Sequence, residues 1–174
     1  MAIFVAGIHG VGKTFLAKPA AESLGLRYAT ASQLIRDERG RVTWSGGKFV
    51  DEVAQNQAAL IAAASRLRDA GEKLLLDGHF VLRRAVGKYE CLPESVFRDL
   101  GVSRVLLLEC SPTIILSRLS GRGDNSWSEQ DIQDFDHAEH QHSSAVCASL
   151  GIDHMTLTEP DLATFIAAIS RANI

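Results

Sequence analysis

The feature that most constrains this chain is a glycine-rich segment that directly follows a short apolar run. Residues 7–14 read GIHGVGKT and match the pattern G-x-x-x-x-G-K-[ST], and residues 3–6 read IFVA. An apolar run of this length before a turn predicts a buried strand. A strand that ends in this pattern predicts a loop that wraps around the phosphates of a nucleotide. The alternative is a glycine-rich turn without a ligand.

The residue types in the segment suit a bound anion. Gly7, Gly10 and Gly12 permit backbone angles that turn successive N–H groups inward, and a helix that opens near Gly12 points its positive end at the same place. Lys13 is expected to place its ammonium group on the β- and γ-phosphates. The Thr14 hydroxyl is expected to bind Mg²⁺, which prefers oxygen ligands.

Three further side chains belong to the predicted nucleotide site, namely His9, Val11 and Phe15. The side chain of His9 is expected to turn outward from the loop. His9 is then either a ligand or a position at which the loop tolerates many residue types.

Composition favours one enzyme-sized domain. The chain has 174 residues and 46% hydrophobic content, and no linker-like stretch, repeat or low-complexity segment divides it. The formal net charge of −3 gives no basic field for a nucleic acid or an anionic membrane. Nucleic acid is therefore an improbable partner, and no feature indicates a protein partner.

The cysteines and the amino terminus bear on location. Cys91, Cys110 and Cys147 are far apart and lack the C-x-x-C spacing of a zinc or redox site, so we expect thiols in a reducing compartment. Nothing at the amino terminus resembles a signal peptide, and no apolar run approaches the roughly 20 residues of a membrane-spanning helix. The expected location is the cytoplasm.

Strand-like and helix-like segments alternate along the chain, which predicts parallel strands joined by crossover helices. Continuous apolar runs such as residues 105–108 suit strands covered on both faces, so the expected fold is a three-layer α/β/α domain. The carboxyl ends of the strands should carry the site. The five expected strands are residues 2–6, 26–30, 73–77, 104–109 and 152–157.

A carboxylate and an imidazole follow the third expected strand. Residues 74–80 read LLLDGHF, so Asp77 ends an apolar run. After a phosphate-binding loop, such a carboxylate orients Mg²⁺ beside the γ-phosphate, although a strand-end Asp can equally be a cap or turn residue. His79 is a candidate to orient a water or a phosphate, with a core histidine as the alternative.

At this point the chain resembles the archaeal and nuclear type of adenylate kinase, within the nucleoside monophosphate kinases. The resemblance spans almost the whole chain. It implies a five-stranded parallel sheet in the order 2-3-1-4-5 and transfer of the γ-phosphoryl of Mg·ATP to a nucleoside monophosphate. The matching segments are residues 7–14, 24–28 (LGLRY), 34–36 (LIR), 77–79 (DGH) and 116–123 (LSRLSGRG).

The resemblance also implies roles for several arginines. Arg118 and Arg122 fall on the segment that matches a closing lid, where they would neutralise the transferring phosphoryl group; a solvated helix face is the alternative. Arg36 falls where such kinases hold the acceptor phosphate, unless it is a surface arginine. The resulting organisation is one domain, 1–174, with an acceptor-binding insertion at about 31–70 and a lid at about 118–128.

The insertion contains a predicted loop at residues 39–48 and a predicted long helix over residues 50–70. The amide of Gln57 interrupts the apolar stripe of that helix, and it either recognises the acceptor base or makes a structural hydrogen bond. Earlier in the chain, Pro19 falls inside the first expected helix, where a kink or an early end is expected.

A helix is expected to begin after Ser128 and to carry several ionisable residues. Three histidines on it do not converge on one point, so zinc binding is not expected. Three carboxylates on it are expected to face solvent. These residues are His137, His140 and His142, and Asp134, Asp136 and Glu139.

The sequence leaves the acceptor open. In common adenylate kinases the Asp-Gly pair leads into Phe-Pro-Arg, whereas residues 79–81 read HFV here. The resemblance therefore does not fix AMP as the substrate. Two other functions remain alternatives, namely an ATPase that acts as a nucleotide-dependent switch or assembly factor, and a kinase of small molecules or nucleic-acid ends.

Overall fold

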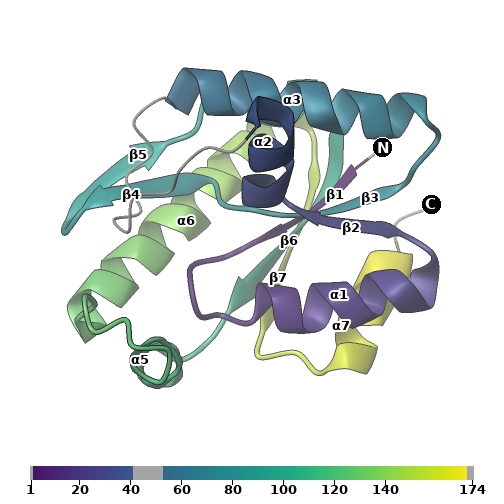
Figure 1. Ribbon diagram of the computed structural model, residues 1–174. Helices are drawn as coiled ribbons and strands as arrows, with labels where there is room; N and C mark the ends of the chain where they lie inside the picture. Colours follow the sequence, from purple (N-terminus) through teal and green to yellow (C-terminus); the bar gives the residue numbers. More distant parts are fainter. Residues whose placement is uncertain (1, 41–52, 172–174) are drawn as a thin grey trace.

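The computed structural model describes residues 2–40 and 53–171. A five-stranded parallel sheet lies between two layers of helices (Figure 1). Its strands stand side by side in the order β2-β3-β1-β6-β7. They are β1 (Ala2–Ala6), β2 (Arg27–Thr30), β3 (Leu74–Asp77), β6 (Val102–Glu109) and β7 (Asp153–Thr158).

The predicted three-layer α/β/α class is confirmed. Each of the five expected strands is present. β1 has the expected ends, and the ends of the other four differ from the expected ones by at most two residues. Counted in chain order without the hairpin described below, the parallel strands stand in the order 2-3-1-4-5. Because two hairpin strands fall between the third and fourth of them, the last two carry the labels β6 and β7.

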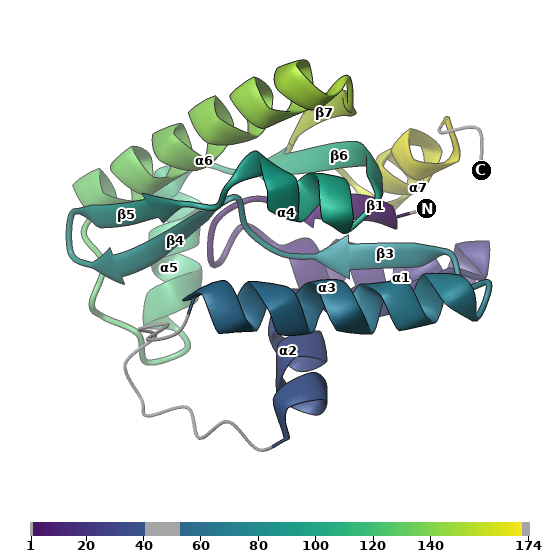
Figure 2. The ribbon, with the colours of Figure 1, turned by 90° about the horizontal axis from the view of Figure 1, so that it is seen from above.

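The helical layers are unequal. One face of the sheet is covered by α1 and α7, and the opposite face by α3, α4 and α6 (Figures 1 and 2). Helices α2 and α5 extend these layers, since α2 packs on α3 and α5 packs on α6. The helices are α1 (Lys13–Leu24), α2 (Ala31–Arg39), α3 (Val53–Asp69), α4 (Glu94–Asp99), α5 (Pro112–Ser120), α6 (Glu129–Leu150) and α7 (Leu162–Ser170).

The central strands are buried because helices cover both of their faces. Every residue of β1 and β3 is buried, which matches sequences that are apolar throughout except for Asp77 at the end of β3. Beneath the layer of α3, α4 and α6, the rings of Phe80 and Phe97 stack with centroids 3.9 Å apart, and Phe4 meets both rings edge-on. This packing fixes the chain that leaves the carboxyl end of β3.

An antiparallel hairpin was not predicted. Its strands are β4 (Val81–Ala85) and β5 (Lys88–Cys91), which turn at Gly87 with φ +64° and lie beside α6 (Figure 2). The residue pattern signals it only weakly, because Arg83 and Arg84 interrupt the apolar alternation that marks a strand. Arg83 donates to the Ser126 carbonyl oxygen and lies over the Trp127 ring, whereas Arg84 pairs with Glu90 on the other strand of the hairpin.

Pro19 does not end the first helix. Helix α1 continues through it to Leu24, so the expected early end is wrong. Ala17, Ala20 and Ala21 pack into the core on both sides of the proline. Tertiary packing of this face outweighs one missing backbone hydrogen bond.

The structure describes the helix of the expected acceptor insertion but only the start of its loop. The expected loop at residues 39–48 lies mostly outside the described residues. The expected long helix is described as α3, within its expected limits. Across residues 2–40 and 53–171, no helix combines the length and the apolar character that crossing a membrane requires.

Candidate functional site

The glycine-rich segment forms a loop between β1 and α1 at the carboxyl edge of the sheet. Gly7, Gly10 and Gly12 have φ values of +131°, +82° and +114°, a region that favours glycine. At Gly7 there is also no room for a side chain, because a Cβ would lie 2.6 Å from the Leu108 carbonyl oxygen. The loop ends at Lys13, where α1 begins and its N-terminal amides face the loop.

Lys13 turns back into the loop. Its Nζ atom lies 2.5 Å from the Gly7 carbonyl oxygen, 3.2 Å from the Ile8 carbonyl oxygen and 3.9 Å from Asp77 Oδ1. Burial lowers the pKa of Lys13, while the nearby negative charges of Asp77 and Glu139 oppose that shift. A phosphate group entering the loop would provide stronger acceptors for the ammonium than these carbonyls do.

Asp77 joins Lys13 and Thr14 at the end of β3. Asp77 Oδ2 accepts hydrogen bonds from Thr14 Oγ1 and from the Tyr28 hydroxyl, each at 3.1 Å. Burial raises the pKa of Tyr28 to about 12, so its hydroxyl remains a donor at neutral pH. The hydroxyl and carboxylate oxygens of Thr14 and Asp77 are the donor types that Mg²⁺ prefers, so these residues fit that ion. The sequence had not suggested Tyr28.

His79 and His9 lie together on the other side of Lys13. His79 Nε2 is 3.2 Å from Lys13 Nζ, and the rings of the two histidines have centroids 4.4 Å apart. His9 is half-buried and also packs near Trp127 and Phe135, so its expected outward orientation is wrong. The cause is the aromatic surface that α6 and the chain before it present to the loop.

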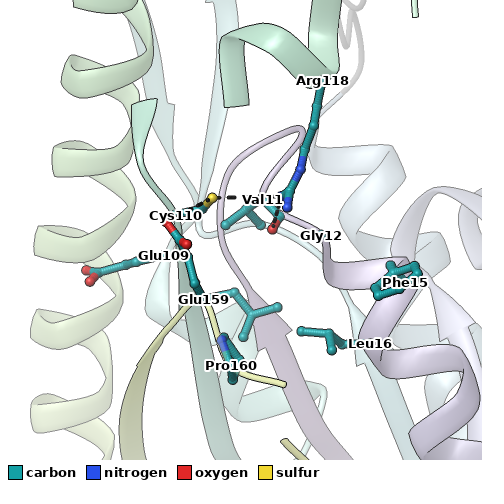
Figure 3. Close-up of a pocket in the computed structure, with 10 residues that line it drawn as sticks. Val11, Gly12, Phe15, Leu16, Glu109, Cys110, Arg118, Glu159 and Pro160 are labelled. Carbon is teal, nitrogen blue, oxygen red and sulfur yellow. Dashed lines mark hydrogen bonds between the residues drawn. The ribbon is translucent and has the colours of Figure 1, made fainter. Parts of the chain in front are cut away.

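Arg118 reaches from α5 to the outer side of the loop (Figure 3). Its Nη1 atom donates to the carbonyl oxygens of Gly10 at 3.1 Å and Val11 at 2.9 Å. Arg122 instead lies exposed in the turn after α5. Arg36 is exposed on α2, and Gln57 is half-buried on α3. In the part of the chain that the structure describes, no hydrogen bond or ion pair joins these three side chains to the phosphate-binding loop.

A pocket of about 240 Å³ opens beside Arg118, between α1 and the ends of β6 and β7 (Figure 3). Phe15, which is 83% exposed, stands at its rim on α1, and Pro160 enters from the loop after β7. Glu159 in that loop has φ +46° and accepts a hydrogen bond from the Ser111 N–H. A guanidinium plane beside apolar side chains suits a planar base.

Glu139 on α6 is the main correction to the expected site. It was expected to face solvent, but it is fully buried and accepts hydrogen bonds from the N–H groups of Gly7, Phe80 and Val81. Asp136 is half-buried, whereas Asp134 is exposed as expected. A signal existed, because Glu139 falls on the same stripe of α6 as the buried Ile132 and Phe135.

Fold and site together define a P-loop nucleotide-binding α/β protein, since the loop, the lysine and the strand-end carboxylate meet at the carboxyl edge of a parallel sheet. Residues 6–135 match the family model described as AAA domain. Because this match covers well over half of the chain, the protein belongs to that family.

Solved structures with the same fold include P-loop kinases. Shikimate kinase from Acinetobacter baumannii, solved with shikimate, superposes with a TM-score of 0.63 at 17% identity, covering 98% of this chain and 90% of that one. Shikimate kinase from Aquifex aeolicus superposes with a TM-score of 0.61 at 12% identity, covering 99% of this chain and 95% of that one. A sugar kinase from Janibacter sp. superposes with a TM-score of 0.56 at 17% identity, covering 98% of this chain and 92% of that one. No curated protein matches the sequence.

Proposed function

We propose that this protein is an ATP-dependent phosphotransferase whose acceptor is a nucleoside monophosphate, similar to the archaeal and nuclear type of adenylate kinase. The observation that carries the proposal is the meeting of Lys13, Thr14 and Asp77 at the mouth of a phosphate-binding loop. A cation and two oxygen ligands at this point suit the terminal phosphates of a nucleotide with its metal ion.

Each part of the site then has a task. The loop amides and Lys13 hold the β- and γ-phosphates of ATP, and Arg118 with the adjacent pocket holds its nucleoside. Thr14 and Asp77 would hold Mg²⁺, which supplies positive charge next to the transferring phosphoryl group. The reaction is an in-line transfer in which positioning and charge neutralisation provide most of the acceleration.

The acceptor is assigned to the other side of Lys13. Residues 31–70, with Arg36 and Gln57, would bind the nucleoside monophosphate, and residues 118–128, with Arg122, would close over the donor. No general base is required, because the acceptor phosphate is already largely ionised near neutral pH.

One contact favours a second candidate, a small-molecule kinase that phosphorylates a hydroxyl group. His79 Nε2 lies 3.2 Å from Lys13 Nζ, next to the expected position of the γ-phosphate. A neutral imidazole there can take the proton that a hydroxyl loses on attack. A nucleoside monophosphate does not need this proton acceptor, so the consequence of removing His79 separates the two candidates.

The deciding experiment follows ADP release from Mg·ATP, first without an acceptor and then with each nucleoside and deoxynucleoside monophosphate. A second panel contains small polyols, sugars and hydroxy acids. Lys13→Ala is the control for contaminating activity. We expect one monophosphate to raise the rate strongly and the matching diphosphate to appear.

The outcomes separate the candidates. Stimulation by a hydroxyl compound alone, abolished by His79→Ala, would replace the first candidate with the second. Lys13-dependent hydrolysis that no acceptor changes would reject both and favour a nucleotide-dependent switch.

A further inference from the structure

The proposed phosphoryl transfer assigns no role to Glu139. Its side chain is 0% exposed, in the middle of the 22-residue helix α6. Burying a carboxylate is costly unless hydrogen bonds or opposite charges compensate for the lost water. Burial raises the pKa of Glu139 to about 7, while its hydrogen bonds and the charge of Lys13 act in the opposite direction.

The hydrogen-bond partners of Glu139 come from the two segments that build the phosphate site. Oε1 lies 3.3 Å from the Gly7 nitrogen, at the first residue of the phosphate-binding loop. Oε1 and Oε2 lie 2.9 and 3.0 Å from the Phe80 nitrogen, and Oε2 lies 2.8 Å from the Val81 nitrogen. Phe80 follows directly after His79. One carboxylate therefore joins the segment of Lys13 to the segment of Asp77 and His79.

Gly7 is held from two directions. Its N–H donates to Glu139, and its carbonyl oxygen accepts from Lys13 Nζ at 2.5 Å. The N–H of Gly7 is thus directed at α6 and serves to anchor the loop. The negative charge of Glu139 also favours the protonated form of Lys13, which burial disfavours.

The position of Glu139 is itself well determined. Ile132, Phe135 and Val146 on the same side of α6 are buried in the core. At its amino end, α6 has a capping box in which Ser128 Oγ accepts from the Asp131 N–H and Asp131 accepts from the Ser128 N–H. A rigid helix therefore presents the carboxylate to the two loops.

We propose that Glu139 is a positioning residue that fixes the distance between the phosphate-binding loop and the segment carrying Asp77 and His79. The inference rests on the proposed function, because it assigns Glu139 to the same phosphoryl-transfer site. Glu139 does not touch the nucleotide. It keeps Lys13, Thr14 and Asp77 in the arrangement that the transfer requires.

The first test compares Glu139→Gln with wild type. Glutamine has the same length but only one acceptor oxygen, and its NH₂ group would face a backbone N–H. We expect kcat with the best acceptor to fall about 100-fold, as small displacements of reacting groups do, with a smaller change in KM for ATP. Glu139→Asp is too short to reach both segments and should not restore kcat. The control is Asp134→Asn, an exposed carboxylate on the same helix.

A purely structural role predicts a different result. In that case the melting temperature of Glu139→Gln would fall, but kcat per folded molecule would stay near the wild-type value. That result would overturn the proposal, and so would full activity of Glu139→Asp.

The second test needs no variant and no activity. In a ¹H–¹⁵N spectrum of the wild-type protein, the amide protons of Gly7, Phe80 and Val81 should be shifted downfield and protected from exchange, because charged acceptors make strong hydrogen bonds. Rapid exchange at all three would overturn the proposal. If the spectrum agrees and Mg·ADP binds, but no acceptor is phosphorylated, the proposed function fails while the anchoring by Glu139 stands.

Discussion

At the scale of single residues, the site depends on a few groups whose contacts leave little tolerance. Asp77 accepts hydrogen bonds from both Thr14 and Tyr28, and Lys13 lies 3.9 Å away. The Asp77 carboxylate therefore orients the Thr14 hydroxyl and balances the buried charge of Lys13 at the same time. Loss of its charge and loss of one of its hydrogen bonds should have different consequences.

Asp77→Asn should reduce kcat about 100-fold or more, because a preorganised charge at the reacting centre is removed while the shape is kept. Tyr28→Phe is the matched variant, since it deletes one hydrogen bond to Asp77 and leaves the carboxylate in place. It should lower the free energy of unfolding by about 1 kcal/mol and the rate only severalfold. Steady-state rates and urea unfolding of both variants test this. Equal rate losses in the two variants would contradict the assigned role of Asp77.

A second residue-scale prediction concerns two glycines with positive φ. Gly7→Ala should lower the free energy of unfolding by about 3 kcal/mol or more, because backbone strain adds to a clash with the Leu108 carbonyl. Gly25→Ala is the control, as its φ is +64° but nothing lies within 4 Å, and it should cost about 1 kcal/mol. Urea denaturation measures both values. Equal losses in the two variants would mean that the backbone shifts to relieve the clash between a Cβ at Gly7 and the Leu108 carbonyl.

At the scale of elements, α6 links the core to the site. Its buried stripe packs on the sheet and the hairpin, while Phe135 and Glu139 face the phosphate-binding loop. The pattern of residues in a helix decides which side chains share a face, but the neighbouring elements decide what that face meets. We therefore expect a well-capped first turn of α6 to contribute to the free energy of unfolding.

Ser128→Ala removes the hydroxyl that accepts from the Asp131 N–H, so we expect a loss of about 1 kcal/mol in the free energy of unfolding. Ser23→Ala, at an exposed position inside α1, should be neutral or slightly stabilising because alanine has the higher helix propensity. Thermal and urea unfolding compare the two. A neutral Ser128→Ala would show that Asp131 alone holds the helix start.

At the scale of the whole molecule, buried carboxylates make stability depend on pH. Burial raises the pKa of Glu139 to about 7, and burial with the nearby Glu109 charge raises the pKa of Asp136 to about 6, where His140 and His137 act in the opposite direction. In the unfolded chain both groups have ordinary values near 4. At pH values between the pKa of these groups in the unfolded chain and their pKa in the folded protein, the folded protein binds more protons than the unfolded chain does.

The free energy of unfolding should therefore fall as pH rises from about 5 to about 8. Asp136→Asn should reduce the slope below pH 6, because its carboxyl no longer titrates. Asp134→Asn, on the same helix but exposed, should run parallel to wild type. Carboxylates whose pKa is lowered, such as Glu38 and Asp131, lose their contribution only at more acidic pH. Burial lowers the pKa of His154, so this one side chain opposes the trend set by the two buried carboxylates near neutral pH. Urea unfolding across this range tests the sign, and a rise in stability with pH would contradict it.

Nucleotide binding should be visible as stabilisation of the entire fold. A ligand that binds only the folded state adds about 2.7 kcal/mol at a concentration of 100 Kd. Mg·ADP should accordingly raise the melting temperature of wild type, and Lys13→Ala should abolish most of the shift. Lys18→Ala, an exposed lysine on α1, is the control and should shift like wild type. An unchanged shift in Lys13→Ala would place the nucleotide elsewhere.

The sequence by itself determined the parts of this protein that depend on local pattern. Continuous apolar runs marked the buried strands, and the spacing of Gly7, Gly12, Lys13 and Thr14 marked the phosphate-binding loop, because strand burial and left-handed glycine turns leave direct traces in residue order. Asp77 was found for the same reason, as the polar residue that ends an apolar strand.

Only the tertiary structure decided which distant groups complete the site. Glu139 was read as a surface charge because carboxylates are rarely buried, and only the approach of α6 to two loops provides the N–H groups that make its burial tolerable. Tyr28 likewise reaches Asp77 from another element. Arg118 was expected from the resemblance, but its contact with the carbonyl oxygens of the loop was not. Such contacts join residues far apart in the chain, and a single sequence carries no direct record of them.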